Sequence, residues 1–203
     1  MKSQSKTKIT NLTPMIIEER AMNITGITVY DRLMMNRIIY LGEPIDDYVA
    51  NTIISQLLFL DSQNNNPITI YINCPGGDVY SGLAIYDTMQ LIKSPIHTVV
   101  AGFAASMAFV LATAGEKGNR KSLEHSTFMM HQPLQGGCGY KQATEIQIEN
   151  DEIQRLKKDL FTIISNHSNL DVDTLTAMGE RDKYLTPSQC IEYGFLDTII
   201  TKK

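Results

Sequence analysis

Short apolar runs alternate with stretches of helical periodicity through the first two thirds of the chain. The apolar runs have the length of single strands, and Gly, Asn or Pro closes most of them. Strands are therefore predicted at residues 37–42, 68–73, 96–102 and 126–133. Helices are expected after Asp46 or Asp47, over residues 78–94, and from Ser106 onward. This alternation predicts an α/β fold with a mostly parallel sheet and right-handed crossovers.

The last third of the chain follows a different pattern. A Gly-rich segment, residues 134–142, precedes a long helix expected from about Ala143 to Asn166. Its apolar residues repeat at heptad-like spacing, so the helix is expected to project from a small domain and to need a partner for its stripe (Ile146, Ile153, Leu156, Leu160, Ile163). A short helix with a capping box begins after Thr186 and stops at Gly194, and a last strand is expected over residues 195–200.

Composition narrows the class of protein. The 203 residues suit one domain, or one domain with a protruding element, and the net charge of −4 argues against nucleic acid as the main partner. Three separated cysteines without a C-x-x-C pair argue against a disulfide framework or a zinc knuckle. The first 13 residues are expected to be flexible and contain no signal peptide, and the most apolar stretch, residues 99–115, is too short to span a membrane. We therefore expect a soluble, intracellular protein.

Candidate catalytic groups follow three of the predicted strands. Gly76-Gly77 come after the strand at 68–73, Ser106 after that at 96–102, and His131 lies at the end of the strand at 126–133. The carboxyl ends of parallel strands gather at one edge of a sheet. With Asp182 as the orienting acid, and the Gly77 and Met107 N–H groups as oxyanion donors, these residues fit a serine hydrolase site.

The same residues also have ordinary structural interpretations. A serine at a helix start is usually a cap, a Gly-Gly pair is usually a turn, and a histidine at a strand end is often structural. His97, His125 and His167 compete for the role of base, and other carboxylates compete with Asp182. The G-x-S-x-G pattern is absent, and the order Ser, His, Asp matches none of the three familiar orders. The residues alone favour serine hydrolysis without deciding it.

A resemblance supplies what the residues leave open. The chain resembles the proteolytic subunits of the Clp protease family over nearly its whole length, in "YINCPGGDVYSGLAIYDTMQ", "GFAASMA", "FMMHQP", "QATEI" and "ERDKYLTPSQCIEYGFLD". The resemblance implies a crotonase-like fold of repeated β-β-α units. It further implies a serine endopeptidase with Ser106 as nucleophile, His131 as general base and Asp182 as orienting acid. The N–H groups of Gly77 and Met107 would form the oxyanion hole.

The resemblance also implies an assembly. Two stacked seven-membered rings would enclose the active sites, and a AAA+ unfoldase would feed unfolded chains into them. The expected compartment is a bacterial cytoplasm or an organelle interior. The unfoldase would hydrolyse ATP, since this chain has no G-x-x-x-x-G-K-[ST] loop, and no metal or organic cofactor is expected. No membrane partner is expected either.

Individual segments acquire expected roles in the same way. Residues 14–203 would be one protease domain and residues 1–13 a leader or axial loop. Within the domain, residues 134–166 would form a handle that contacts the opposite ring, its Gly-rich part being a strand beside the substrate. Arg181 would link ring–ring contact to the order of the site. Cys74 and Ala108 depart from the family's usual serine and glycine.

Two other functions remain open. One is a catalytically inactive ring subunit that acts as a scaffold, which would be expected to lack a triad member. The other is a crotonase-like acyl-CoA enzyme, which would stabilise a thioester oxyanion with the same kind of paired N–H donors but would use glutamates. An assay for acyl-CoA turnover would distinguish the acyl-CoA enzyme from the protease.

Overall fold

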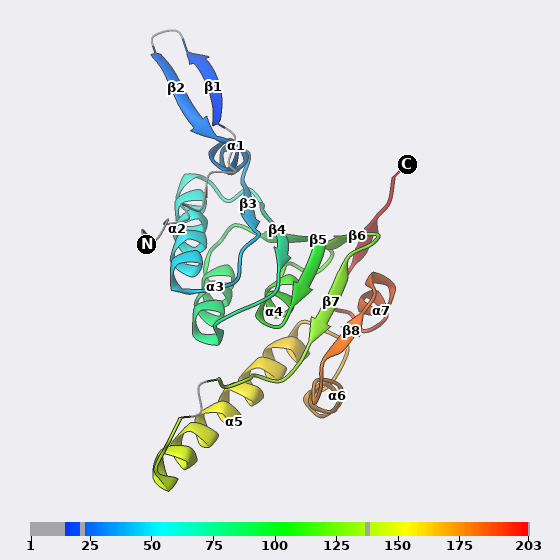
Figure 1. Ribbon diagram of the computed structural model, residues 1–203. Helices are drawn as coiled ribbons and strands as arrows, with labels where there is room; N and C mark the ends of the chain where they lie inside the picture. The colour runs from blue at the N-terminus through cyan, green and yellow to red at the C-terminus, as the bar shows by residue number, and fades with distance from the viewer. Residues whose placement is uncertain (1–14, 21–22, 137–138, 203) are drawn as a thin grey trace, which may run out of the picture.

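The computed structural model describes residues 15–20, 23–136 and 139–202. Strands and helices alternate along most of this length (Figure 1). The strands are β1 (Met15–Arg20), β2 (Asn23–Thr28), β3 (Ile38–Leu41), β4 (Ile68–Cys74), β5 (Ile96–Ala105), β6 (Arg120–Leu123), β7 (Thr127–Met130), β8 (Lys183–Leu185) and β9 (Thr198–Ile200). The helices are α1 (Val29–Met35), α2 (Asp47–Gln63), α3 (Val79–Leu91), α4 (Met107–Thr113), α5 (Ala143–Asn166), α6 (Val172–Met178) and α7 (Pro187–Glu192).

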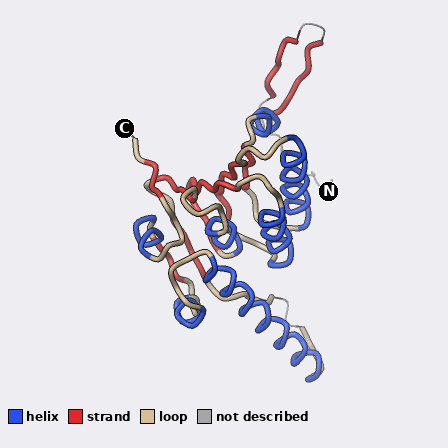
Figure 2. Tube along the Cα trace, turned by 180° about the vertical axis from the view of Figure 1, so that it is seen from behind, coloured by secondary structure: helices blue, strands red, loops and turns tan. Residues whose placement is uncertain are grey.

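One sheet forms the centre of the molecule. Strands β3, β4, β5, β6 and β9 are parallel neighbours in that order. Strand β7 is parallel to β5 and antiparallel to β8. Helices α3 and α4 lie on the same side of this sheet (Figure 2), and all seven residues of α4 are buried. The predicted mostly parallel α/β fold is confirmed.

Strand β5 belongs to two ladders. Its first half pairs with β6, and its second half, from Phe103 onward, pairs with β7. Gly102 lies between the halves with φ of 112°, and a Cβ there would lie 2.6 Å from the Oδ1 atom of Asn73. The same oxygen accepts a hydrogen bond of 3.1 Å from the Phe103 N–H. The bend therefore needs glycine, and it directs the end of β5, where Ser106 follows, toward β7.

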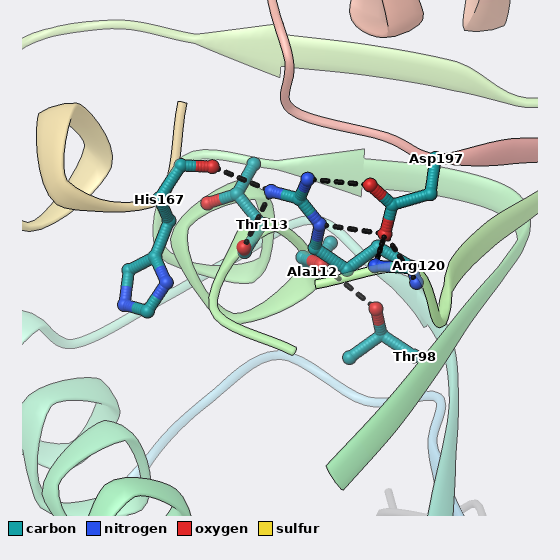
Figure 3. A network of polar contacts seen from close by, with 7 residues as sticks. Thr98, Ala112, Thr113, Arg120, His167 and Asp197 are labelled. Carbon is teal, nitrogen blue, oxygen red and sulfur yellow. Dashed lines mark hydrogen bonds and ion pairs between the residues drawn. The ribbon is translucent and has the colours of Figure 1, made fainter. Parts of the chain in front are cut away.

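A buried ion pair fixes the far end of α4. Arg120 of β6 makes a two-point contact with Asp197 just before β9, Nη2 to Oδ1 at 2.6 Å and Nε to Oδ2 at 2.9 Å (Figure 3). Its Nη1 atom donates to the carbonyl oxygens of Thr113 and His167. Arg120 thus holds the last residue of α4, the end of α5 and the sheet edge together, so α4 is held firmly behind Ser106.

The long helix is confirmed at Ala143–Asn166, and it projects from the body (Figure 1). Its second half packs on the core through Leu156, Leu160, Phe161 and Ile164. In its first half, Ile146 and Ile148 are 56% and 64% exposed. Only part of the heptad stripe therefore finds a partner within this chain.

Several predicted boundaries differ from the structure. The strand predicted at 126–133 ends at Met130, and that predicted at 195–200 begins at Thr198. The strand predicted at 96–102 continues to Ala105. No sequence pattern predicted β1, β2, α1, β6, β8 or α6. Strand β6 (RKSL) carries two cations, one of them in the buried ion pair, so no apolar pattern marks it.

The prediction of a strand in the Gly-rich segment is wrong for the residues that the structure describes. Residues 134–136 and 139–142 form no strand. Apart from the adjacent residues, no atom of the described chain lies within 4 Å of a Cβ built on Gly136 or Gly139. In the described part of the segment, no residue pairs with a neighbouring strand, so its backbone N–H and C=O groups lack the partners that a strand needs.

The structure bears only partly on the expectations for the N-terminal residues and the cysteines. Residues 1–13, expected to be a leader or axial loop, and Cys138 lie outside the described residues. Cys74 and Cys190 are free and buried, and burial raises the pKa of Cys190 to about 12. No helix in the described part of the chain is long and apolar enough to cross a membrane.

Candidate active site

Ser106 stands on a sharp turn between β5 and α4. Its backbone has φ of 54° and ψ of −123°, a strained conformation for a residue other than glycine that costs about 1–3 kcal/mol. Ser106 occupies the N-cap position of α4, but its side chain makes no capping hydrogen bond, so the hydroxyl does not cap the helix. Strained strand-to-helix turns of this kind expose the nucleophile in α/β hydrolases.

Small buried neighbours allow this turn without the G-x-S-x-G pattern. Ala104 and Ala108, at the two glycine positions of that pattern, are both 0% exposed. The Met107 side chain packs on α3, where a Cβ added to Gly82 would lie 2.0 Å from Met107 Cγ. The Met107 N–H belongs to the unpaired first turn of α4 and makes no hydrogen bond among the described residues. It is therefore a free donor beside Ser106.

His131 reaches the site through the β5–β7 ladder. Ala105 pairs with Met129, and the Ser106 N–H donates to the Met129 carbonyl at 2.8 Å. His131 follows two residues later and lines the same cavity as Ser106. The competing histidines lie elsewhere: His97 contacts Glu116, His125 is exposed on the turn after β6, and His167 ends α5.

Asp182 reaches His131 through the β7–β8 ladder. The antiparallel register pairs Met130 with Lys183, which sets the residues just beyond them, His131 and Asp182, side by side. The Nδ1 atom of His131 lies 3.9 Å from the Oδ1 atom of Asp182. This distance suits an ion pair and is longer than a hydrogen bond. Two sheet registers thus bring together three residues that are far apart in sequence.

The Gly-Gly turn after β4 lies directly against Ser106. A Cβ on Gly76 would lie 2.7 Å from Ser106 Cβ, and one on Gly77 would lie 2.1 Å from the Ile45 carbonyl oxygen. Ile45 binds the turn from the other side, because its N–H donates to Gly76 and its carbonyl accepts from Asp78. The Gly77 N–H makes no hydrogen bond among the described residues. The turn thus holds a second free donor at the site.

Sequence reasoning gave Cys74 no role, yet its thiol supports this turn. The sulfur donates to the Glu43 carbonyl at 3.1 Å and accepts from the Gly76 N–H at 3.3 Å. Burial raises the pKa of the Cys74 thiol, so it stays protonated and able to donate at neutral pH. The only signal in the sequence was its position immediately before Pro75-Gly76-Gly77.

An apolar cavity of about 240 Å³ opens beside Ser106 and His131. It is enclosed by the Gly77 turn, by α4 and by the second half of α5. Its walls are mostly hydrocarbon, which suits an apolar side chain of a substrate. The lining residues are Pro75, Gly77, Val79, Ser106, Met107, Val110, Met129, His131, Pro133, Leu134, Leu160, Phe161 and Ile164.

Arg181 precedes Asp182 and is exposed. Its Nη1 atom lies 3.3 Å from the carbonyl oxygen of the adjacent Glu180. The structure therefore places Arg181 beside the proposed acid. In the described part of the chain, no group of three or more His, Cys, Asp or Glu side chains is arranged to hold a metal ion.

Comparison with known proteins identifies the family. The family described as Clp protease matches residues 20–203. The chain belongs to the Clp protease family. It is 52% identical to the ATP-dependent Clp protease proteolytic subunit of Bacteroides thetaiotaomicron, over 95% of this chain and 87% of the relative. Identity is 50% to the subunit of Porphyromonas gingivalis (94% and 86% covered) and 46% to proteolytic subunit 1 of Prochlorococcus marinus strain MIT 9312 (94% and 97% covered).

Membership in the Clp protease family makes the chain a proteolytic subunit and a peptidase, and it confirms the resemblance recognised in the sequence. The two residues that the resemblance marked as unusual, Cys74 and Ala108, are accommodated locally. Cys74 keeps a donor and an acceptor under the Gly-Gly turn, and Ala108 is fully buried beneath Ser106. Neither change blocks the cavity.

Proposed function

We propose that this Clp protease subunit is a serine endopeptidase that uses Ser106, His131 and Asp182. The Ser106 Oγ atom attacks the carbonyl carbon of a peptide bond while His131 takes its proton. The N–H groups of Gly77 and Met107 donate to the oxyanion, and Asp182 orients and stabilises the imidazolium. His131 then protonates the leaving amine, and water releases the acyl group from Ser106. None of these steps needs a metal or an organic cofactor.

The observation that carries this proposal is the strained Ser106 turn between two free N–H donors. A serine held at φ of 54° without a capping bond costs stability, and such strain persists where function needs it. Gly77 and Met107 flank it from two different elements, and His131 lines the same cavity. The arrangement supports acyl transfer at Ser106.

The cavity supports a preference for apolar residues before the cleaved bond. Val79, Met129 and Phe161 supply hydrocarbon walls, and burying an apolar side chain there would gain about 1.5–3 kcal/mol. Peptides with Leu, Met or Phe at that position should therefore be cleaved faster than peptides with Asp.

We propose that the protein works as an assembly together with a partner protein. The printed names of the relatives call them subunits of an ATP-dependent protease, and this chain has no phosphate-binding G-x-x-x-x-G-K-[ST] loop. We infer that a AAA+ unfoldase supplies ATP hydrolysis and unfolded protein chains. The exposed apolar residues in the first half of α5 support contact between two stacked seven-membered rings. We propose that Arg181, which precedes Asp182, links that contact to the site.

A fluorophosphonate tests the mechanism on the assembled protein. We expect one adduct, mapped by peptide mass to Ser106, with loss of hydrolysis of a fluorogenic peptide. Ser106→Ala should assemble normally, take no adduct, and lose more than about 10,000-fold in kcat.

Three outcomes would contradict the proposal. Full activity of Ser106→Ala would exclude this nucleophile. No adduct in an intact assembly, with or without the unfoldase, would favour the inactive scaffold. Turnover of an acyl-CoA without peptide hydrolysis would favour the crotonase-like enzyme.

A further inference from the structure

A polar network joins α5 to the two segments that carry His131 and Asp182. Lys157 of α5 donates from Nζ to Gln132 Oε1 at 2.8 Å, and the same nitrogen lies 3.3 Å from Glu180 Oε2. Gln132 directly follows His131, and Glu180 lies two residues before Asp182. The Lys157 side chain is only 18% exposed, so water screens these contacts less than it screens contacts on an open surface.

Gln132 clamps the two segments directly. Its backbone N–H donates to the Gly179 carbonyl at 2.8 Å, and its Nε2 atom donates to the Glu180 carbonyl at 3.0 Å. Lys157 fixes which way the Gln132 amide points, because an ammonium accepts no hydrogen bond and must face the amide oxygen. With Oε1 bound to Lys157, the amide NH₂ is held toward Glu180.

Asp182 depends on this clamp for its position. Its side chain is 60% exposed and makes no hydrogen bond among the described residues, and its contact with His131 is the ion pair at 3.9 Å. The backbone on either side must therefore place it. The β7–β8 ladder begins just after it at Lys183, and the bonds from Gln132 hold the chain just before it.

A second contact from α5 supports the same segment. A Cβ added to Gly179 would lie 2.6 Å from Phe161 Cζ. Phe161 follows Lys157 by one helical turn and also lines the cavity beside Ser106. One face of α5 therefore contacts both the substrate cavity and the segment that leads to Asp182.

We propose that Lys157 and Gln132 are positioning residues of the peptidase reaction. They set the separation of His131 and Asp182 by tying the residue after the base to the residues before the acid. The inference rests on the proposed function, since Lys157 and Gln132 can position the reaction only if His131 is the base. Neither residue touches the reacting atoms, so both act through the His131–Asp182 pair.

The test measures hydrolysis of a short fluorogenic peptide by the assembled protein, with assembly verified by native mass. Lys157→Met keeps length and removes charge. It should lower kcat about 10- to 100-fold, as misplacement of a catalytic group by about 1 Å does, and change KM less than about twofold. Lys157→Arg should restore most of kcat. Lys158→Met, a change at the adjacent exposed lysine, should match the wild type.

Gln132→Glu provides a second route if Lys157→Met fails to assemble. A glutamate still accepts from Lys157 but cannot donate to the Glu180 carbonyl, so kcat should fall in the same way. In an Asp182→Asn background, Lys157→Met should cause little further loss, because the pair it positions is already broken.

A wild-type kcat in both Lys157→Met and Gln132→Glu would overturn the inference. It would also be overturned if Lys157→Met lowered kcat by the same factor in the Asp182→Asn background as in the wild type. The labelling experiment separates this failure from that of the proposed function. No fluorophosphonate adduct on wild-type Ser106 would remove the proposed function itself. An adduct together with unchanged Lys157 and Gln132 variants would remove the positioning role alone.

Discussion

The position of the Ser106 hydroxyl depends on a backbone that most residues avoid. With φ of 54° the turn carries strain, and a serine or alanine Cβ bears it equally, whereas glycine does not. The hydroxyl and the strain are thus separable properties of one residue. A substitution can remove the hydroxyl and either keep or relieve the backbone strain.

Ser106→Gly should therefore be more stable than Ser106→Ala by about 1 kcal/mol, the strain relieved minus the entropy that glycine loses on folding. Both variants should be inactive. Thermal unfolding at one protomer concentration measures the difference. Equal melting temperatures would show that the turn at Ser106 is unstrained.

At the scale of residues, the sequence predicted which groups meet but not how. Ser106, His131 and Gly77 follow strands whose carboxyl ends converge, which sequence order alone suggests. Asp182 required the β7–β8 register, and β8 is a three-residue strand that no pattern reveals. The supporting contacts of Cys74, Gln132 and Lys157 join segments distant in sequence, so only the folded chain shows them.

Among the elements, the junction of β6, β9, α4 and α5 depends on the Asp197 carboxylate. Burial acts to raise the pKa of Asp197, but hydrogen bonds from Arg120 and Gly118 outweigh it and lower the pKa. A carboxyl with a lowered pKa in the folded protein contributes stability above its unfolded pKa of about 3.9, and that stability is lost as pH falls through the folded pKa. Acid should therefore weaken this junction.

Asp197→Ala should lower the free energy of unfolding near neutral pH by about 3 kcal/mol, because it leaves the Arg120 guanidinium buried without its carboxylate. The variant should also lose less stability than the wild type between pH 4 and the lowest pH at which both stay folded. Unfolding in urea across this range measures both effects. A stability loss on acidification that is the same in the two proteins would contradict the role given to Asp197.

Elements with strong local signals were predictable, and those defined by partners were not. Helix α5 agrees with its predicted limits, and α7 has the predicted capping box between Thr186 and Gln189. Strand β6 was missed because its sequence is polar and its place is fixed by Arg120. The resemblance implied a strand in the Gly-rich segment, but the described residues of that segment pair with no other strand.

On the scale of the whole molecule, the first half of α5 leaves Ile146 and Ile148 in water. Under the proposed assembly, the opposite ring covers this surface. Ile146→Glu should then convert a two-ring assembly into single rings of half the mass, since each copy loses about 1.5–3 kcal/mol of apolar burial. Native mass spectrometry measures this directly.

Gln154→Glu is the matched control, because it adds the same charge at an exposed position of the same helix. It should leave the mass of the assembly unchanged. A full-size assembly in Ile146→Glu would show that this part of α5 is not the contact between rings.

The bend at Gly102 has a consequence for how the molecule opens. The first half of β5 is central, with β4 and β6 on either side, whereas its second half leads to β7 and the short β8 at the rim. Folded proteins open in cooperative units, and short peripheral strands separate before central ones. Ser106 follows the second half of β5 and begins the buried helix α4. We therefore expect the rim to exchange its amide hydrogens, and to lose the His131–Asp182 pair, while the body stays folded. Under the proposed mechanism, loss of activity and loss of the global fold would therefore be separate events.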